Sequence, residues 1–293
     1  TATINTAGVT NATLVSGGMV TGDNVTVAAT GTFADKNVNT SKVVTLSSTY
    51  GGADAANYNI TSQVNATANI TAKALNITGI TADNKVYDGN TTATINTSGV
   101  TNATLVSGGM VSGDNVTVSA SGTFANKNAN TSILVTLNST YGGADASNYN
   151  ITSQANTTAN ITAKTLNITG ITANTKVYDG NTSATINTSG VTNATLVSGG
   201  MVAGDSVTVS ATGAFADKNA NLSKVVMLTS TYGGTDVSNY NITSQTFTQT
   251  DITPKTLNIS GITAANKVYD GNANATVSTS GVTAAVLQSG GMV

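Results

Sequence analysis

The chain has 293 residues, a formal net charge of −2 and only 8% charged residues. It contains no His, Cys, Trp, Arg or Glu, so its 11 cations are all Lys and its 13 anions are all Asp. This composition excludes an imidazole base, a thiolate nucleophile, the usual zinc ligands and disulfides, and the charge gives no electrostatic footprint for nucleic acid.

In chain order, short alternations of apolar and polar residues are separated by turn signals. Within residues 74–164, strands are predicted around Leu75–Ile77, Val116–Phe124, Val135–Leu137 and Tyr149–Ile151, with turns at Asp88-Gly89, Gly108-Gly109, Ser112-Gly113-Asp114 and Gly142-Gly143. No stretch of ten residues carries a helical stripe. We therefore predict an all-β fold in which each unit has seven to nine short strands, as a β-sandwich-like or β-grasp-like domain.

These elements recur at a fixed step. Tyr87, Tyr178 and Tyr269 stand in copies of one hexapeptide, Lys-Val-Tyr-Asp-Gly-Asn, and are 91 residues apart with no insertion between them. A unit of this length can bury a modest core of its own, so the period predicts successive domains rather than a solenoid.

The repeat boundaries are expected where a new strand follows Ile-Thr-Ala-Lys or Ile-Thr-Pro-Lys. This gives a partial repeat without its first strand at 1–73, full repeats at 74–164 and 165–255, and a partial repeat at 256–293, as in a window from a longer array. Almost no linker separates consecutive repeats, so we predict a semi-rigid, extended rod whose repeats each unfold as a cooperative unit.

Five ordered motifs carry a family resemblance. They are the hexapeptide above, Gly-Asp-Asn-Val-Thr-Val (22–27, 113–118), Gly-Thr-Phe-Ala-Asp-Lys-Asn (31–37), Gly-Gly-Ala-Asp-Ala-x-Asn-Tyr (51–58, 142–149) and Ile-Thr-Pro-Lys (252–255). Together they resemble the YDG domain, which occurs in arrays in bacterial surface adhesins of the filamentous haemagglutinin type. The sequence departs modestly from this pattern, with Ile-Thr-Ala-Lys at 70–73 and 161–164 and Gly-Ala-Phe at 213–215.

The resemblance implies an extracellular or cell-surface protein whose repeats form a fibre or stalk in adhesion, filament or biofilm formation. It implies that surface receptors or matrix glycans are contacted by regions outside these residues. The family brings no catalytic residues. Asp pairs remain possible acid–base groups, but with so few reactive side chains we predict no enzyme activity, no cofactor and no metal site.

The recurrent Asp residues have two interpretations. As calcium ligands they would need several oxygen donors at close spacing, whereas each turn supplies one Asp. The sequence favours turns in which Asp caps backbone amides and Gly adopts positive φ. The residues concerned are Asp88, Asp179 and Asp270 with Asn90, Asn181 and Asn272, and likewise Asp23, Asp114 and Asp205.

Aromatic residues make up only 4% of the chain. Sugar stacking is one role for the repeated tyrosines, but so few rings are better explained as core residues with hydrated hydroxyls. This applies to Tyr87, Tyr178 and Tyr269, and as core to Phe33, Phe124 and Phe215.

Lysines offer a further chemistry. An isopeptide bond from Lys85 or Lys127 to an Asn, with Asp88 as catalyst, is one hypothesis. We favour lysines that solvate strand edges.

Twenty-four Asn-x-Ser/Thr sequons are present, and the candidates for glycosylation are Asn11, Asn24, Asn65, Asn102, Asn115 and Asn193. Glycans would solubilise a surface with few charges, and a polar Asn/Thr strand face explains the same residues. Both interpretations stay open.

Two functional alternatives also remain. In the first alternative, each repeat is a carbohydrate- or calcium-binding module, and repetition of the module adds avidity. In the other, chains self-associate by strand addition, with the strand at Leu257–Ile262 as donor. Neither a nucleic-acid partner nor a membrane span is expected, since no apolar run approaches the ~20 residues that cross a bilayer.

Overall fold

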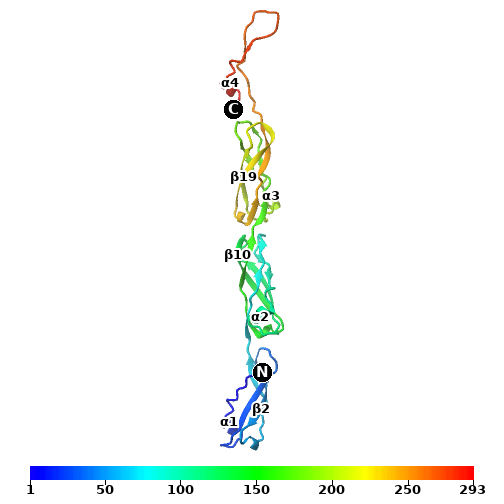
Figure 1. The fold of residues 1–293 in the computed structure, drawn as a ribbon, viewed down its shortest axis with the longest axis vertical. Helices are drawn as coiled ribbons and strands as arrows, with labels where there is room; N and C mark the ends of the chain where they lie inside the picture. The colour runs from blue at the N-terminus through cyan, green and yellow to red at the C-terminus, as the bar shows by residue number, and fades with distance from the viewer. The chain divides into compact units, whose positions relative to one another are not determined.

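The computed structural model describes residues 1–293, apart from the side chain of Ala12. It is 41% strand and 11% helix, so the prediction of an all-β chain built from repeated sheets is confirmed. Figure 1 labels β2, β10 and β19, the long strands that occupy the same position in three successive repeats.

The elements follow one order in each repeat. The first stretch holds α1 (Asn11–Ser16), β1 (Thr26–Phe33), β2 (Asn39–Gly51), the 3-10 helix η1 (Ala55–Asn57) and β3 (Asn65–Ile70). The second holds β4 (Lys73–Asn76), β5 (Thr81–Ala82), β6 (Lys85–Val86), β7 (Thr92–Ala93), β8 (Ile95–Asn96), α2 (Asn102–Ser107), β9 (Thr117–Phe124), β10 (Asn130–Gly142), η2 (Ala146–Asn148), β11 (Tyr149–Thr152) and β12 (Asn156–Thr162).

The next stretch repeats that order. It holds β13 (Lys164–Asn167), β14 (Thr172–Ala173), β15 (Lys176–Val177), β16 (Ser183–Ala184), β17 (Ile186–Asn187), α3 (Asn193–Ser198), β18 (Thr208–Phe215), β19 (Asn221–Gly233), η3 (Val237–Asn239), β20 (Tyr240–Thr243) and β21 (Phe247–Thr253). The last stretch holds β22 (Thr263–Ala264), β23 (Val277–Ser278) and α4 (Ala284–Ser289).

A five-stranded sheet dominates each full repeat. Its order is β6-β12-β10-β9-β7 in the second stretch and β15-β21-β19-β18-β16 in the third. Antiparallel β18 and β19 pair Val209 with Tyr232, whereas β15 and β21 are parallel. The first strand of each repeat pairs in parallel with a late strand, as β4·β11 and β13·β20. Along β18, buried or half-buried positions alternate with exposed ones, as the apolar–polar alternation predicts.

Short helices are the main element that the strand patterns do not predict. Thr101 caps α2 through a capping box with Thr104, and the helix buries Leu105. Its end requires glycine, because a Cβ on Gly108 would lie 2.1 Å from the carbonyl oxygen of Asn76. Six residues are too few for an amphipathic stripe, so the sequence shows this helix only through its cap.

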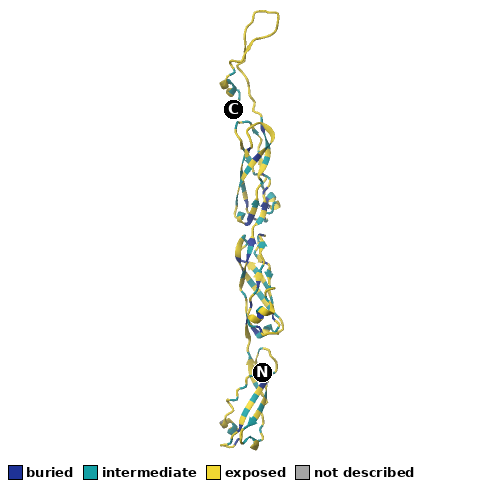
Figure 2. Ribbon diagram, in the orientation of Figure 1, coloured by how far each residue is buried: buried dark blue, intermediate teal, exposed yellow. Residues whose placement is uncertain are grey.

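Buried apolar residues gather in two clusters, and only one of them includes a helix residue, Leu105 of α2. Leu75, Ile77, Ile80, Leu105, Met110, Val116 and Tyr149 form one core cluster, and Phe215, Val226 and Ile252 form another. Phe124 and Phe215 are buried, which confirms their predicted core role, and Phe33 is half-buried. In contrast, all residues from 254 to 281 are exposed (Figure 2).

Compact units do not coincide with single repeats. Unit 1 comprises Thr1–Asp83, Thr92–Phe124 and Leu134–Ala159, and unit 2 comprises Asn84–Thr91, Ala125–Ile133 and Asn160–Val293. Unit 2 therefore contains a turn and a loop of the second repeat together with the third repeat. Leaving aside Ala12, no helix of the structure is long and apolar enough to span a membrane.

Candidate functional site

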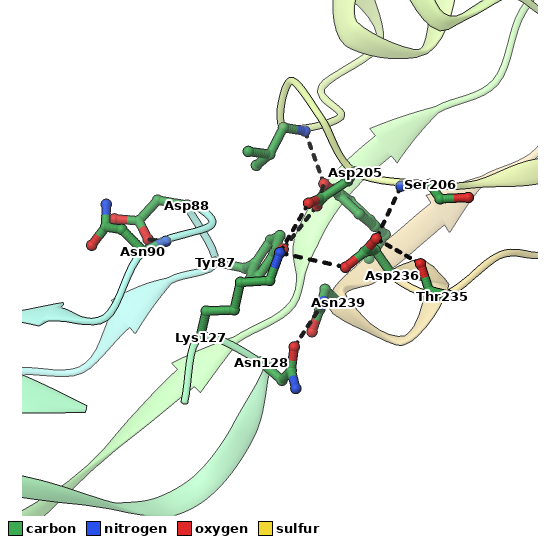
Figure 3. Close-up of polar contacts among 12 residues, drawn as sticks. Tyr87, Asp88, Asn90, Lys127, Asn128, Asp205, Ser206, Thr235, Asp236 and Asn239 are labelled. Carbon is green, nitrogen blue, oxygen red and sulfur yellow. Dashed lines mark hydrogen bonds and ion pairs between the residues drawn. The ribbon is translucent and has the colours of Figure 1, made fainter. Parts of the chain in front are cut away.

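A buried polar cluster of unit 2 is centred on Asp205. This residue lies in the turn between α3 and β18, where its amide donates to the Val202 carbonyl oxygen at 3.2 Å. Tyr240 begins β20, Tyr87 follows β6, and Lys127 lies in the loop between β9 and β10. Three segments that are far apart in sequence thus place their side chains around one carboxylate (Figure 3).

The Asp205 carboxylate accepts three hydrogen bonds. Oδ2 accepts from the hydroxyl of Tyr87 at 2.8 Å and from that of Tyr240 at 2.6 Å. Oδ1 accepts from Lys127 Nζ at 3.3 Å. Only 4% of the Asp205 side chain is exposed, so these donors replace the water that a carboxylate would otherwise bind.

The rings of Tyr87 and Tyr240, whose hydroxyls both donate to Asp205, also pack against each other. Their centroids lie 5.6 Å apart at an interplanar angle of 80°, an edge-to-face contact. Lys127 Nζ lies 5.9 Å from the centroid of the Tyr87 ring. The Tyr87 ring therefore packs against the Tyr240 ring and also lies beside the Lys127 ammonium.

Asp236 and Asn239 extend the cluster along η3. Lys127 Nζ lies 3.5 Å from Asp236 Oδ1, and the Ser206 amide donates to Asp236 Oδ2 at 3.0 Å. The Ala129 amide donates to Asn239 Oδ1 at 2.9 Å. Because Asn239 is buried, this bond ties the Lys127 loop to the third repeat by its backbone. We call Tyr87, Lys127, Asp205, Asp236, Asn239 and Tyr240 the Asp205 cluster.

The electrostatics of the cluster follow from burial and hydrogen bonding. Burial, and then the Asp205 carboxylate, raise the pKa of Tyr240 and of Tyr87. The Tyr87 hydroxyl and Asp205 raise the pKa of Lys127. The Ser206 amide is the main cause that lowers the pKa of Asp236. These directions favour neutral tyrosines and a charged Lys127–Asp236 pair at neutral pH.

Unit 1 contains the same arrangement 91 residues earlier. Lys36 Nζ lies 2.8 Å from Asp114 Oδ1 and 2.7 Å from Asp145 Oδ1. Tyr149 donates to Asp114 at 2.6 Å, and the Val38 amide donates to Asn148 Oδ1 at 2.9 Å. We call Lys36, Asp114, Asp145, Asn148 and Tyr149 the Asp114 cluster. Its recurrence shows that the contact belongs to the repeat pattern and not to one site.

The comparison with family models assigns these repeats. The model of the YDG domain matches residues 1–66, 71–158, 162–247 and 253–290. The chain belongs to the YDG domain family. Comparisons with curated proteins and with solved structures found no match.

The Asp of the YDG hexapeptide is a turn residue, as predicted. Asp88 Oδ1 accepts from the Asn90 amide at 3.1 Å and forms an ion pair with Lys85 at 2.7 Å, while Gly89 has φ 81°. Asp179 and Asp270 repeat the contact to Asn181 and Asn272. Among the described residues, no three His, Cys, Asp or Glu side chains gather as a candidate metal site. Figure 3 shows Asp88 and Asn90 pointing away from the Asp205 cluster.

For Asp205 and Asp114 the turn interpretation is incomplete. Both stand in the predicted turns, but their carboxylates bind a lysine and at least one tyrosine from distant segments. Asp23 makes the tyrosine contact that lies within one repeat, since it accepts a hydrogen bond from the Tyr58 hydroxyl at 2.7 Å. Alternation patterns cannot reveal such contacts. The only sequence signal was that Lys, Asp and Tyr recur at one fixed offset from each other.

The YDG tyrosines differ among the repeats. Tyr87 is 1% exposed, and its hydroxyl is buried against Asp205, so the predicted hydrated hydroxyl is wrong for this copy. Tyr178 is half-buried against the core of its own repeat. Tyr269 is 93% exposed.

The remaining candidates are placed as follows. Lys85 Nζ lies 2.9 Å from Asn90 Oδ1, so the structure brings together Lys, Asn and Asp88 of the isopeptide hypothesis. Asp88 is 46% exposed, however, which fits a solvated ion pair and not a buried triad. Lys127 belongs to the Asp205 cluster instead. All six sequon asparagines (Asn11, Asn24, Asn65, Asn102, Asn115 and Asn193) are exposed, and their glycosylation stays a prediction.

Proposed function

We propose that this chain is a structural segment of a bacterial cell-surface or secreted adhesin, in which consecutive YDG repeats form a stalk or fibre. The proposal rests on one lysine–aspartate contact that occurs twice in the chain. Lys36 and Lys127 each bridge two Asp residues of the following repeat at identical sequence offsets. A contact of this kind joins repeats and has no reactive group to turn over a substrate.

The side-chain inventory supports a structural role. The exposed positions of β9 are Thr117, Ser119, Ser121 and Thr123, which hydrate a sheet face without many charges. Each full repeat has a buried core, as a fibre under tension requires. Receptor or matrix contacts would then belong to other parts of the protein, and self-association of filaments is a compatible extension.

Localisation and adhesion in the native bacterium test the proposal. Antibodies against the repeats should label intact cells or the culture supernatant, and deletion of the gene should reduce attachment to host cells or to abiotic surfaces. Labelling confined to permeabilised cells, or attachment unchanged by deletion, would contradict it. A strain that retains the repeats but lacks the remaining domains separates a stalk role from direct adhesion.

A second candidate function is repeated binding of a neutral glycan. A shallow groove of about 420 to 430 Å³ occurs at one equivalent position in each of three repeats. In the third repeat it is lined by Asn167, Thr169, Ala194, Thr195, Ser198 and Gly199. These amides and hydroxyls match the hydrogen-bonding groups of an uncharged sugar, and repetition would add avidity.

The groove is tested by titrating the chain with neutral oligosaccharides while following the amide signals of α3 by NMR. Ser198→Phe should abolish shifts at its own groove and leave those at Ser107 unchanged. If no neutral oligosaccharide perturbs any of the grooves, the binding-module alternative is rejected and the structural role remains.

A further inference from the structure

We propose that the YDG tyrosine and the loop lysine form a docking face for the next repeat, so that folding of consecutive repeats is energetically coupled through Asp205. This face docks against three residues of the following repeat, which in the third repeat are Asp205, Asp236 and Tyr240. The inference concerns folding within the chain, and it holds whether or not the protein is an adhesin.

Comparison of equivalent residues within the chain supports this role. Tyr87, whose hydroxyl donates to Asp205 of the third repeat, is 1% exposed, whereas Tyr178 of the other full repeat is half-buried. Lys36 and Lys127 bridge carboxylates of the following repeat, but Lys218, the third copy, forms no ion pair among the described residues. The deeper burial of Tyr87 thus accompanies its contact with Asp205 of the third repeat.

The accepting half of the contact is organised before docking. At the first repeat, no described lysine or YDG tyrosine reaches Asp23, yet Tyr58 still donates to it at 2.7 Å. Asp54 still accepts from the Asn24 amide at 2.9 Å, as Asp145 does from Asn115. A preformed acceptor loses little conformational entropy when the lysine arrives, which favours docking.

The donating half is organised as well. In the third repeat, Asp217 accepts from the Asn219 amide at 2.8 Å and pairs with Lys224, which holds the Lys218 loop in place. The Tyr178 amide donates to the Thr253 carbonyl oxygen at 2.9 Å, as the Tyr87 amide does to Thr162. Both halves therefore exist without their partner, and docking adds contacts that neither repeat can make alone.

Docking then makes each half more stable, because Asp205 is almost fully desolvated in the complete cluster. Removing one donor leaves a buried carboxylate with an unfilled hydrogen bond, which costs more than an exposed pair would. The cost is shared by two repeats, since Tyr87 and Lys127 come from one and Asp205 from the next. A change in the third repeat should therefore be felt in the second.

Amide hydrogen exchange on the full 293-residue chain tests this directly. Asp205→Asn should accelerate exchange about tenfold at Ala129 and around Tyr87, which lie in the preceding repeat, because a charge-assisted bond is lost. The matched control is Asp23→Asn, which removes the same carboxylate where the structure has no incoming lysine. Its effect should stay within the first repeat.

A second pair of variants keeps the test decisive if Asp205→Asn unfolds the third repeat. Lys127→Met should accelerate exchange at the Asn239 and Asp236 amides, while Lys218→Met should change no distant amide. Acceleration confined to the mutated repeat in both Asp205→Asn and Lys127→Met would overturn the proposal. Equal long-range effects of Lys127→Met and Lys218→Met would also overturn it, since Lys218 has no carboxylate to bridge.

Discussion

Position 42 and its equivalents in the other repeats show two ways of avoiding a buried charge without a partner. The Lys42 side chain is 7% exposed, and its ammonium binds Asp35 and the Asn37 carbonyl oxygen. Lys224 and Asp217 repeat this pair in the third repeat. In the second repeat the equivalent positions hold Ile133 and Asn126, so both members of the pair differ together. A lysine without its carboxylate would be costly here, whereas an apolar side chain needs no partner.

The pair predicts a non-additive pattern of stability. Asp35→Asn alone should lower the free energy of unfolding of the first repeat, because it leaves the buried Lys42 without its anion. Adding Lys42→Ile should restore stability to the original level or above, since this reproduces the natural Ile133–Asn126 combination. Urea denaturation of the three variants measures it. Equal stability of the single and double variants would show that the ion pair is not what Lys42 depends on.

Ser223, in β19, has a left-handed backbone conformation. It adopts φ 50°, and a register shift between β19 and β21 falls at this point. Its amide donates to Asp251 Oδ1 at 2.7 Å, a bond that Asn69 and Asn160 provide for Ser41 and Ser132. Left-handed backbone disfavours side chains with a Cβ, so the bulge is held by this side-chain acceptor.

Glycine should therefore be tolerated at this bulge. Ser223→Gly is expected to leave stability unchanged or raise it by up to roughly 1 kcal/mol, because relief of the left-handed conformation offsets the entropy of glycine. Ser210→Gly, at an exposed and regular position of β18, is the control and should cost ~0.5–1 kcal/mol. Thermal unfolding compares them. A larger loss for Ser223→Gly than for Ser210→Gly would contradict the strain argument.

At the scale of elements, apolar alternation predicted the longer strands, but the strand expected at Leu257–Ile262 is not formed and the two-residue strands were not predicted. Val116, Val135 and Leu75 are buried at predicted positions, because strand periodicity is a local signal. The six-residue helices were missed because one turn and a half carries no periodic stripe. The Asp205 cluster was also missed, since Tyr87 and Asp205 are 118 residues apart and only the fold brings them together.

The loop and η-helix elements of the Asp114 cluster should be sensitive to acid. Lys36 holds the pKa of Asp114 and of Asp145 below the ordinary 3.8. A lowered folded-state pKa gives stability that is complete above about 3.8 and is lost as the pH falls through the folded value. The ion pairs of this cluster should therefore contribute near neutral pH and vanish well below pH 3.8.

Lys36→Met measures that contribution. Near neutral pH the variant should be less stable than the parent chain, and the difference should disappear in acid, as followed by urea denaturation at each pH. Lys218→Met provides the baseline, because Lys218 bridges no carboxylate and its replacement should change stability little at either pH. A difference for Lys36→Met that does not depend on pH would mean that its carboxylate contacts are not the cause.

For the whole molecule, the sequence predicts repeats that unfold one by one. Two separate core clusters, around Leu75 and around Phe215, agree with repeats that have their own cores, while the Asp205 cluster links the second repeat to the third. Nearest-neighbour coupling of this kind is typical of repeat arrays. Stability should then be the sum of repeat terms and junction terms.

Force spectroscopy should separate these terms. Each full repeat should unfold in its own event and release on the order of 300 Å of chain, since an extended residue spans ~3.3–3.6 Å. Asp205→Asn should lower the unfolding force of the second and third repeats and leave the number of events unchanged. A single rupture for the whole chain would contradict the existence of separate cores.

The coupling itself is the central claim, and a double-mutant cycle between Tyr87 and Asp205 tests it most directly. Tyr87→Phe and Asp205→Asn remove the two halves of one buried hydrogen bond that joins consecutive repeats. We predict that the free energies of unfolding of the two single variants and the double variant give an interaction energy of about 1 kcal/mol or more. Additivity within ~0.3–0.5 kcal/mol, as found for residues that do not interact, would contradict the account.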